Sequence, residues 1–323
     1  MKRNIIGALI LGVVVIVIAS LCIGAANVSL SDLMTALLHP NATTITHGII
    51  WDVRLPRILA ALVCGASLAM AGAVLQATFA NPIVDSALIG ISGSAACGAA
   101  LALLVTPLAQ SSAASIAGSL IGAALAVFIL VRSRQTGLRL TLFGIALGAG
   151  ASALLALIGS DSHRANGRSL VSWLFGSLAL TTWSAVGAVT ISLVLGALML
   201  RGQGRLLDVG SYGAQSAGHL GVDIRRQRVR WLVTVTVLIA PSVALFGAIG
   251  FVGLAVAHIS RMLGAVNHRA LLPLSALIGA GVLTLADTTS RTIAGPMEIP
   301  LSITLALIGS PILFLVLRGM RDE

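Results

Sequence analysis

Charged residues are scarce in this sequence of 323 residues: they make up 9% of the chain, whereas 57% of the residues are hydrophobic. In a soluble globular domain, about a quarter of the residues are charged. The scarcity excludes a soluble globule, because too few charges remain to cover a folded surface in water. Long apolar runs instead predict an all-α, polytopic protein whose helices cross a lipid bilayer many times.

Lysine is almost absent, since Lys2 is the only one in the chain. A P-loop needs a lysine directly after its glycine-rich turn, because that ammonium group reaches the phosphates of the nucleotide. The chain therefore has no P-loop. If ATP drives its activity, a different polypeptide hydrolyses the ATP.

Side chains that carry catalysis or bind metals are few and scattered. The three cysteines lie inside apolar runs without CxxC spacing, so neither a disulfide framework nor a metal site is expected. Asp161 and His163 stand beside serines but form no triad frame. We therefore expect no catalytic residue, no bound metal and no cofactor. The six histidines are also dispersed: His39, His47, His163, His219, His258 and His268.

Ten apolar segments are candidates for membrane spans. The first fits either a signal peptide or a membrane helix, and its roughly 20 apolar residues favour the helix. Segment 250–263 is short for a crossing, and segment 170–178 is expected to be a partial helix outside the membrane. The ten predicted spans are residues 5–25, 58–79, 87–108, 113–131, 140–158, 185–200, 231–249, 250–263, 271–286 and 301–317.

The net charge of +10 comes from cations at the ends of these runs. A nucleic-acid-binding protein would gather them on one basic face, so no nucleic-acid partner is expected. Basic loops of membrane proteins stay in the cytosol. With both chain ends inside, ten spans place fifteen of the twenty cations there. The five on the outside oppose this trend: Arg54, Arg57, Arg164, Arg168 and Arg291.

Glycine and tryptophan carry further information about packing. The 35 glycines include the pairs Gly118/Gly122 and Gly144/Gly148, whose spacing predicts close contact between helices in lipid. The four tryptophans fall near predicted span ends, where an indole suits the membrane interface. These are Trp51, Trp173, Trp183 and Trp231.

The longest polar interval is residues 201–230, here called the basic loop, which carries six arginines and is predicted to be cytosolic. It contains two short helical candidates, 206–212 and 214–220. Gly213 and Gly221 follow them and are expected to end each helix in a left-handed cap. Helices this short are not stable alone in water, so they must rest on the membrane domain or on a partner. We expect one membrane domain over residues 1–323, with this loop attached.

Sequence motifs then point to a family. VRLPR at 53–57, GASLA at 65–69 with Gly72 and Gln76, NP at 81–82 and LIGI at 88–91 closely resemble the signature of the permeases of iron-siderophore, haem and cobalamin ABC importers. The likeness continues with GFVGL at 250–254, and it covers nearly the whole chain. Later matches are His258, Arg261, His268, Arg269, Pro273, Asp287, Arg291, Glu298, Pro300, Gly309 and Pro311. The chain departs from the family pattern at Ala214, Ala257 and Ser302.

The resemblance implies a type II importer permease with ten helices. It also implies the partners: two copies of an ATP-binding subunit, an extracytoplasmic substrate-binding protein and a second permease subunit, identical or homologous, in the inner membrane lipid bilayer. The expected cargo is an iron chelate, most closely an iron-siderophore, with haem and cobalamin left open. No chemistry on the cargo is expected.

Several site residues follow from the resemblance alone. Arg54, Arg57 and Arg291 are expected to contact acidic side chains of the binding protein, with interfacial anchoring by snorkelling as the alternative. Asn81 matches a position near the cytosolic gate, although the loop around Gly137 and Leu138 lacks the small polar residues expected beside it. The positions expected to couple to the ATPase are Gly213, Ala217, Leu220 and Gly221.

Two other classes of protein remain as alternatives. An ion-coupled secondary transporter would need buried acids and inverted repeats, and Asp287 is the single acidic candidate near a predicted span. An intramembrane hydrolase would need serine and histidine side chains that are essential for activity without ATP.

Overall fold

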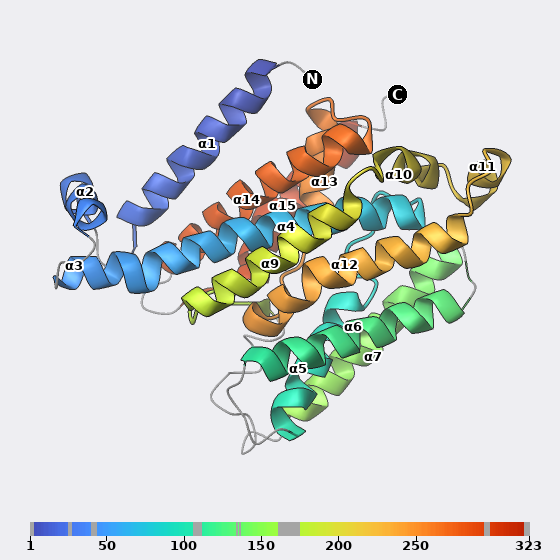
Figure 1. Ribbon diagram of the computed structural model, residues 1–323, viewed down its shortest axis with the longest axis horizontal. Helices are drawn as coiled ribbons and strands as arrows, with labels where there is room; N and C mark the ends of the chain where they lie inside the picture. Colours follow the sequence, from blue (N-terminus) through green and yellow to red (C-terminus); the bar gives the residue numbers. More distant parts are fainter. Residues whose placement is uncertain are drawn as a thin grey trace.

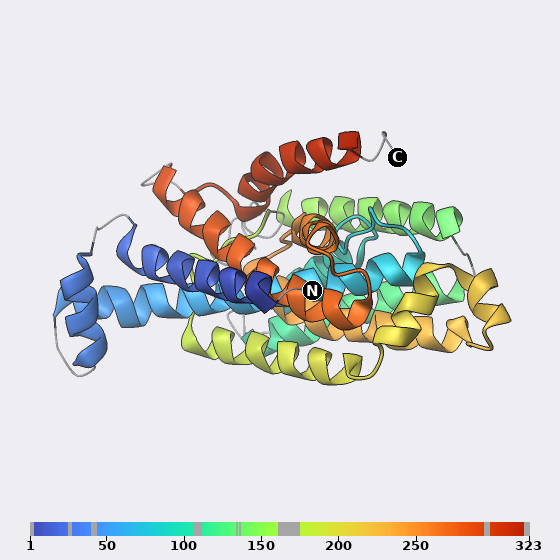
Figure 2. The same ribbon diagram turned by 90° about the horizontal axis from the view of Figure 1, so that it is seen from above.

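The computed structural model describes residues 3–24, 28–39, 44–105, 112–133, 135, 137–160, 175–293 and 298–319, and these residues contain helices and no strand. The helices run side by side in an elongated bundle (Figures 1 and 2). Most of predicted segment 170–178 lies outside the described residues, as do Trp173, Asp161, His163, Arg164 and Arg168. The all-α prediction is confirmed for the described part of the chain.

Each of the ten predicted spans corresponds to one helix. By length and composition, seven described helices are long and apolar enough to cross a membrane, while α5, α13 and the 301–311 part of α15 are shorter apolar helices. The weak prediction at 250–263 thus corresponds to the short α13. The helices are α1 (Arg3–Cys22), α4 (Leu55–Phe79), α5 (Ile91–Val105), α6 (Ser112–Arg132), α7 (Gly137–Ser160), α9 (Trp183–Leu200), α12 (Ile224–Phe246), α13 (Val252–Met262), α14 (His268–Ile293) and α15 (Leu301–Gly319).

Short helices join α1 to α4 at one end of the bundle. They are α2 (Leu30–Leu38), α3 (Ile45–Gly48) and the π-helix η1 (Ile49–Arg54), which runs directly into α4. The Trp51 indole donates to the carbonyl of Ala36 at 3.0 Å, and the Trp183 indole donates to the carbonyl of Trp51 at 3.1 Å. Trp183 begins α9, and Trp51 lies near the start of the helix that continues as α4, so these bonds tie the start of α9 to this end of the bundle.

Helix α4 is the buried centre of the bundle, and it packs against α14 and α13 through glycines. A Cβ added to Gly65 would overlap the carbonyl of Gly279 on α14, and one added to Gly72 would overlap the backbone of Gly253 on α13. Lipid supplies no hydrophobic drive between helices, so their association depends on such close backbone packing. Figure 1 shows α14 lying along α4.

Both glycine motifs found in the sequence lie at helix contacts. Gly118 and Gly122 on α6 touch α5, where a Cβ on either residue would overlap the backbone at Gly98 or Ser94. Gly148 on α7 meets Gly90, and Gly144 meets Ile89, in the turn before α5. The α5–α6 and α4–α14 pairs have the most extensive contacts among the described helices.

The connection from α12 to α13 is a non-helical stretch packed inside the bundle. Helix α12 is about 34 Å long at about 1.5 Å per residue, whereas α13 covers about 16 Å on the way back. The backbone between them needs partners, because lipid offers none. The Ser302 hydroxyl donates to the carbonyl of Ala248 at 3.0 Å and accepts from the Gly250 N–H at 3.1 Å. The serine that departs from the family pattern therefore holds this connection.

We predict that Gly279→Ala destabilises the protein, because the new methyl group must force α4 and α14 apart. Overpacking of this kind costs about 1–3 kcal/mol. The control is Gly187→Ala on exposed α9, where an added Cβ meets nothing within 4 Å. Thermal unfolding in detergent should show a lower midpoint for Gly279→Ala and an unchanged or higher one for Gly187→Ala. Equal midpoints for the two variants would show that the close approach of α4 and α14 is not needed.

Candidate functional sites

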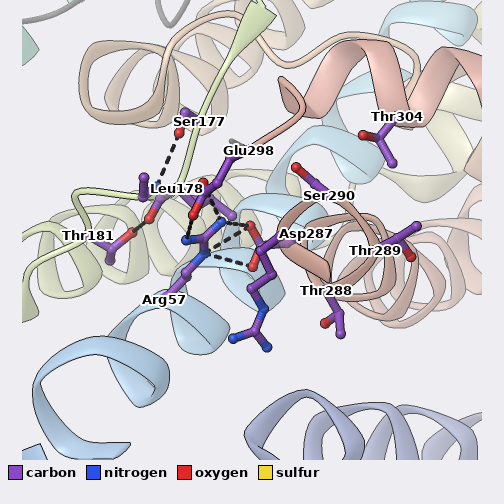
Figure 3. A network of polar contacts seen from close by, with 12 residues as sticks. Arg57, Ser177, Leu178, Thr181, Asp287, Thr288, Thr289, Ser290, Glu298 and Thr304 are labelled. Atoms are coloured by element: carbon purple, nitrogen blue, oxygen red, sulfur yellow. Dashed lines mark hydrogen bonds and ion pairs between the residues drawn. The ribbon is translucent and has the colours of Figure 1, made fainter. Parts of the chain in front are cut away.

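Arg57 lies between two carboxylates near the start of α4. Its Nε donates to both Asp287 carboxylate oxygens at 3.1 and 3.0 Å, and its Nη2 donates to Oδ1 at 2.8 Å. On the other side, Nη1 and Nη2 donate to Glu298 at 2.7 and 2.9 Å. Figure 3 shows Asp287 and Glu298 flanking the guanidinium group. Arg57 thus joins α4 to the end of α14 and to the segment before α15.

Arg54 and Arg291 lie beside this group and bind the last turn of α1. Arg54 Nη1 donates to the carbonyl of Leu21. Arg291 Nη2 donates to the carbonyl of Ser20 and, at 2.7 Å, to its hydroxyl. The last carbonyls of a helix lack intrahelical partners and carry the negative end of its dipole, so the two guanidinium groups cap α1.

We call Arg54, Arg57, Arg291, Asp287 and Glu298 the arginine cluster. The sequence predicts three of these side chains as contacts for another protein, but the structure places them largely inside the chain. Arg54 is 3% exposed, Arg57 is 6% exposed, and Arg291 is half-buried. Their internal partners give these three arginines a structural role within the chain. Asp287 and Glu298 belong to the matched motifs, yet nothing in the sequence pairs them with Arg57.

The basic loop lies at the opposite end of the bundle (Figure 1). It forms α10 (Gly204–Ser211) and α11 (Ala214–His219), close to the predicted bounds. It ends earlier than predicted, because α12 starts at Ile224 and Arg225–Arg230 form its first turns. The Asp223 carboxylate begins that helix by accepting from the backbone N–H groups of Arg225 and Arg226 at 3.1 and 3.3 Å.

Helix α10 rests on Trp231 of α12. The indole is 1% exposed, and a Cβ on Gly210 would lie 2.8 Å from its ring. Its Nε1 donates to the Gln203 side chain at 3.4 Å. The prediction that Trp231 is an interfacial indole is therefore wrong, since this side chain is the surface on which α10 packs. Glycine at 210 lets the helix approach the ring.

Asp208 ties α10 to the start of α14. Its Oδ1 accepts from the backbone N–H of His268 at 2.8 Å, and it lies 2.6 Å from His268 Nδ1. The carboxylate thereby caps the N-terminus of α14, where negative charge is favoured. The sequence singled out His268 only through the family motif and did not single out Asp208, since the two residues are 60 positions apart.

The two glycines of the basic loop adopt different conformations. Gly221 has φ +70°, and the Gly221 and Val222 N–H groups donate to the carbonyls of Gly218 and Ala217, both at 3.1 Å. This is the left-handed cap that the sequence predicts. Gly213 has φ +88° and ψ 167°, which is not that cap, although only glycine adopts it readily.

The side chains in and beside α11 differ in their exposure. The predicted coupling residue Ala217 is fully buried, whereas Leu220 is 65% exposed and Tyr212 is 76% exposed. Helix α11 is thus packed against the chain at Ala217, while the turns on both sides of it present apolar side chains outward.

The predicted gate residue Asn81 lies in the turn after α4. Its side-chain oxygen accepts from the Ile83 N–H at 3.1 Å, after Ala80 ends α4 with φ +49°. Gly137 and Leu138 begin α7, and Leu138 is 70% exposed. These contacts describe a turn and assign it no further role.

Asp85, four residues on, is a buried acid that the sequence did not single out. It accepts from the Phe251 N–H at 3.0 Å and from the Ser86 N–H at 2.6 Å. Within the described part of the chain, no three His, Cys, Asp or Glu side chains gather to hold a metal ion.

Seven of the described helices are long and apolar enough to cross a membrane, and many large apolar side chains are exposed, which defines a multi-span membrane protein. Residues 12–319 match the model of the FecCD transport family. The chain belongs to this family. It is a permease subunit of an ABC importer, in which separate subunits hydrolyse ATP.

Similar proteins agree with this assignment. The chain is 38% identical over 287 residues to the vitamin B12 import system permease protein BtuC of Vibrio cholerae, covering 87% of this chain and 86% of the relative. It is 36% identical over 326 residues to the hemin transport system permease protein HmuU of Yersinia pestis, covering 98% and 97%. A solved structure described as an inward-facing metal-chelate type ABC transporter has a TM-score of 0.85 at 31% identity, covering 98% and 100% of the two chains.

We predict that Asp287→Asn destabilises the fold by about 3 kcal/mol, because it leaves the Arg57 charge buried with one carboxylate fewer. The control is Arg226→Gln, which removes an ion pair whose side chains are 89% and 57% exposed. Thermal unfolding should show a clear loss for Asp287→Asn and almost none for Arg226→Gln, since exposed pairs contribute little. A wild-type midpoint for Asp287→Asn would mean that the ion pair does not hold α4 to α14.

Proposed function

We propose that this permease carries a metal chelate into the cytoplasm, with an iron-siderophore as the cargo that the sequence favours. The relatives named for vitamin B12 and hemin and the metal-chelate transporter structure support this class of cargo. They leave cobalamin and haem as the other members of the same class. The chain does no chemistry on the cargo, so its role is to open and close a path.

The observation that carries the proposal is the attachment of α10. It is seated on Trp231 of α12, it binds the start of α14 through Asp208, and it packs against α4. A force applied to α10 therefore reaches three helices of the bundle at once. The exposed Tyr212 and Leu220 beside it offer apolar contacts to a separate ATP-hydrolysing subunit.

The proposed coupling surface consists of Gly213, Ala217, Leu220 and Gly221. Ala217 packs against the chain, while Leu220 faces outward. The glycines hold turns that other residues adopt only with strain. A rigid α11 would transmit a push from the ATPase to α10, whereas a frayed one would absorb it.

At the other end of the bundle, the arginine cluster supports docking of a substrate-binding protein with acidic side chains. The cluster holds three guanidinium groups and two carboxylates, so positive charge is in excess there. Such a field steers an acidic partner towards this end and increases its association rate. Helix α14 is about 39 Å long, and it runs from His268, which binds Asp208 of α10, to this cluster. It therefore joins the two proposed contact surfaces.

The described contacts do not favour ion-coupled transport. Asp287 is paired with Arg57, and Asp85 is occupied by backbone N–H groups. Each buried acid therefore has a structural partner. We expect that purified permease in vesicles does not accumulate cargo from a proton or sodium gradient alone.

We predict that Gly221→Asp uncouples ATP hydrolysis from uptake without unfolding the bundle. A side chain at φ +70° costs roughly 1 kcal/mol and loosens the end of α11. The control is Gly218→Asp, which adds the same charge within α11, three residues earlier, at a site with open space and an ordinary helical backbone.

The measurement is cargo-stimulated ATP hydrolysis and uptake in vesicles that contain the permease, its ATPase and its binding protein. Uptake should fall several-fold in Gly221→Asp and clearly less in Gly218→Asp. If Gly221→Asp keeps wild-type hydrolysis and uptake, the basic loop has no coupling role. If the permease alone accumulates cargo from an ion gradient, the importer function itself is wrong.

A further inference from the structure

The two carboxylates bound to Arg57 differ in how firmly they are held. Asp287 lies within helix α14, and its side chain is 1% exposed. Glu298 lies in the non-helical segment before α15, and its side chain is 36% exposed. One partner of Arg57 is therefore enclosed by the fold, while the other is at the surface.

The guanidinium group is already occupied on both of its binding edges. Nε and Nη2 donate to the Asp287 carboxylate, while Nη1 and Nη2 each donate to one oxygen of the Glu298 carboxylate. A carboxylate that approaches from outside finds no edge of Arg57 free for paired hydrogen bonds, which are the strong geometry for arginine. It can take the outer edge only if Glu298 leaves.

We propose that Glu298 is an internal substitute for an acidic side chain of the binding protein: it occupies the outer edge of Arg57 before docking and is exchanged for the partner's carboxylate on docking. The inference rests on the proposed function, in which an acidic partner docks at the arginine cluster. The exchange keeps Arg57 paired at every stage. A buried arginine is thereby never left without a counter-charge, which would be costly.

The exchange also has a consequence inside the bundle. The Ile299 carbonyl accepts from the Ser290 hydroxyl, and the Leu301 N–H donates to the carbonyl of Gly176 at 3.1 Å. Without Glu298 on Arg57, the start of α15 is held by these bonds and by the Ser302 bonds to the α12–α13 connection. Further along α15, Gly309 packs against the Phe251 ring at the start of α13. Docking would thus loosen the segment that leads to these packed helices.

The test measures docking of the purified binding protein to the permease–ATPase complex in lipid nanodiscs. The variant Glu298→Gln removes the competing charge and should tighten docking by roughly threefold to tenfold, because the partner's carboxylate no longer displaces a charged rival. The control is Asp52→Asn on exposed η1 near the same end, which removes one negative charge from a side chain that does not bind Arg57. Its effect should be clearly smaller.

Three outcomes separate the inference from the proposed function. Tighter docking in Glu298→Gln than in Asp52→Asn supports the exchange. If the two variants bind the binding protein with equal affinity, the exchange is overturned. Docking at a charged surface still stands in that case, provided that association with the wild type slows at high salt. Wild-type association that does not depend on salt overturns both, because charges then do not guide docking.

If Glu298→Gln does not yield a monodisperse complex, Glu298→Asp takes its place. It keeps the charge but shortens the side chain by one methylene group, which weakens the paired contact with Arg57. Docking should again be tighter than in Asp52→Asn. Docking no tighter than in that control would contradict the exchange.

Discussion

The close approach of α4 and α14 is the contact on which the rest of this structure depends. Gly65 and Gly279 bring the two backbones together, because lipid gives helices no hydrophobic reason to associate and packing must supply it. With α4 and α14 fixed side by side, Arg57 can meet Asp287, and α10 finds one surface made from both helices. The glycines therefore determine the geometry of both ends of the bundle.

The polar contacts at the two ends share one design. At each end, a charged side chain binds a helix terminus or an opposite charge on a distant segment: Asp208 caps α14, and Arg54 and Arg291 cap α1. Non-helical backbone inside the bundle is treated in the same way, with Ser302 and Asp85 holding the connection between α12 and α13. In this family of importers, a permease must move without exposing such groups to lipid.

Much of the fold follows from the sequence, because apolar runs report which segments are buried in lipid or protein. The ten helices, the two short helices of the basic loop and the left-handed cap at Gly221 were all predictable. The partners of the polar residues were not, since Arg57 and Asp287 are 230 positions apart and periodicity carries no information about neighbours. For the same reason, Trp231 was mistaken for an interfacial indole, and the first turns of α12 were assigned to the loop because their arginines are polar. The roles of the arginines and of Gly213, Ala217, Leu220, Gly221 and Asn81 came only from the family resemblance and remain proposals.

The proposed coupling through Asp208 requires α10 and α14 to move as one body between the ATPase and the arginine cluster. It is tested most directly by the distance between spin labels on exposed Arg205 of α10 and exposed Thr292 at the far end of α14. The distance should be measured by pulsed electron paramagnetic resonance in the active, reconstituted complex. The three native cysteines of the permease are replaced beforehand. The account predicts one narrow distance distribution that is the same without nucleotide and with ATP and cargo-loaded binding protein. A distribution that shifts or splits when ATP binds would contradict it.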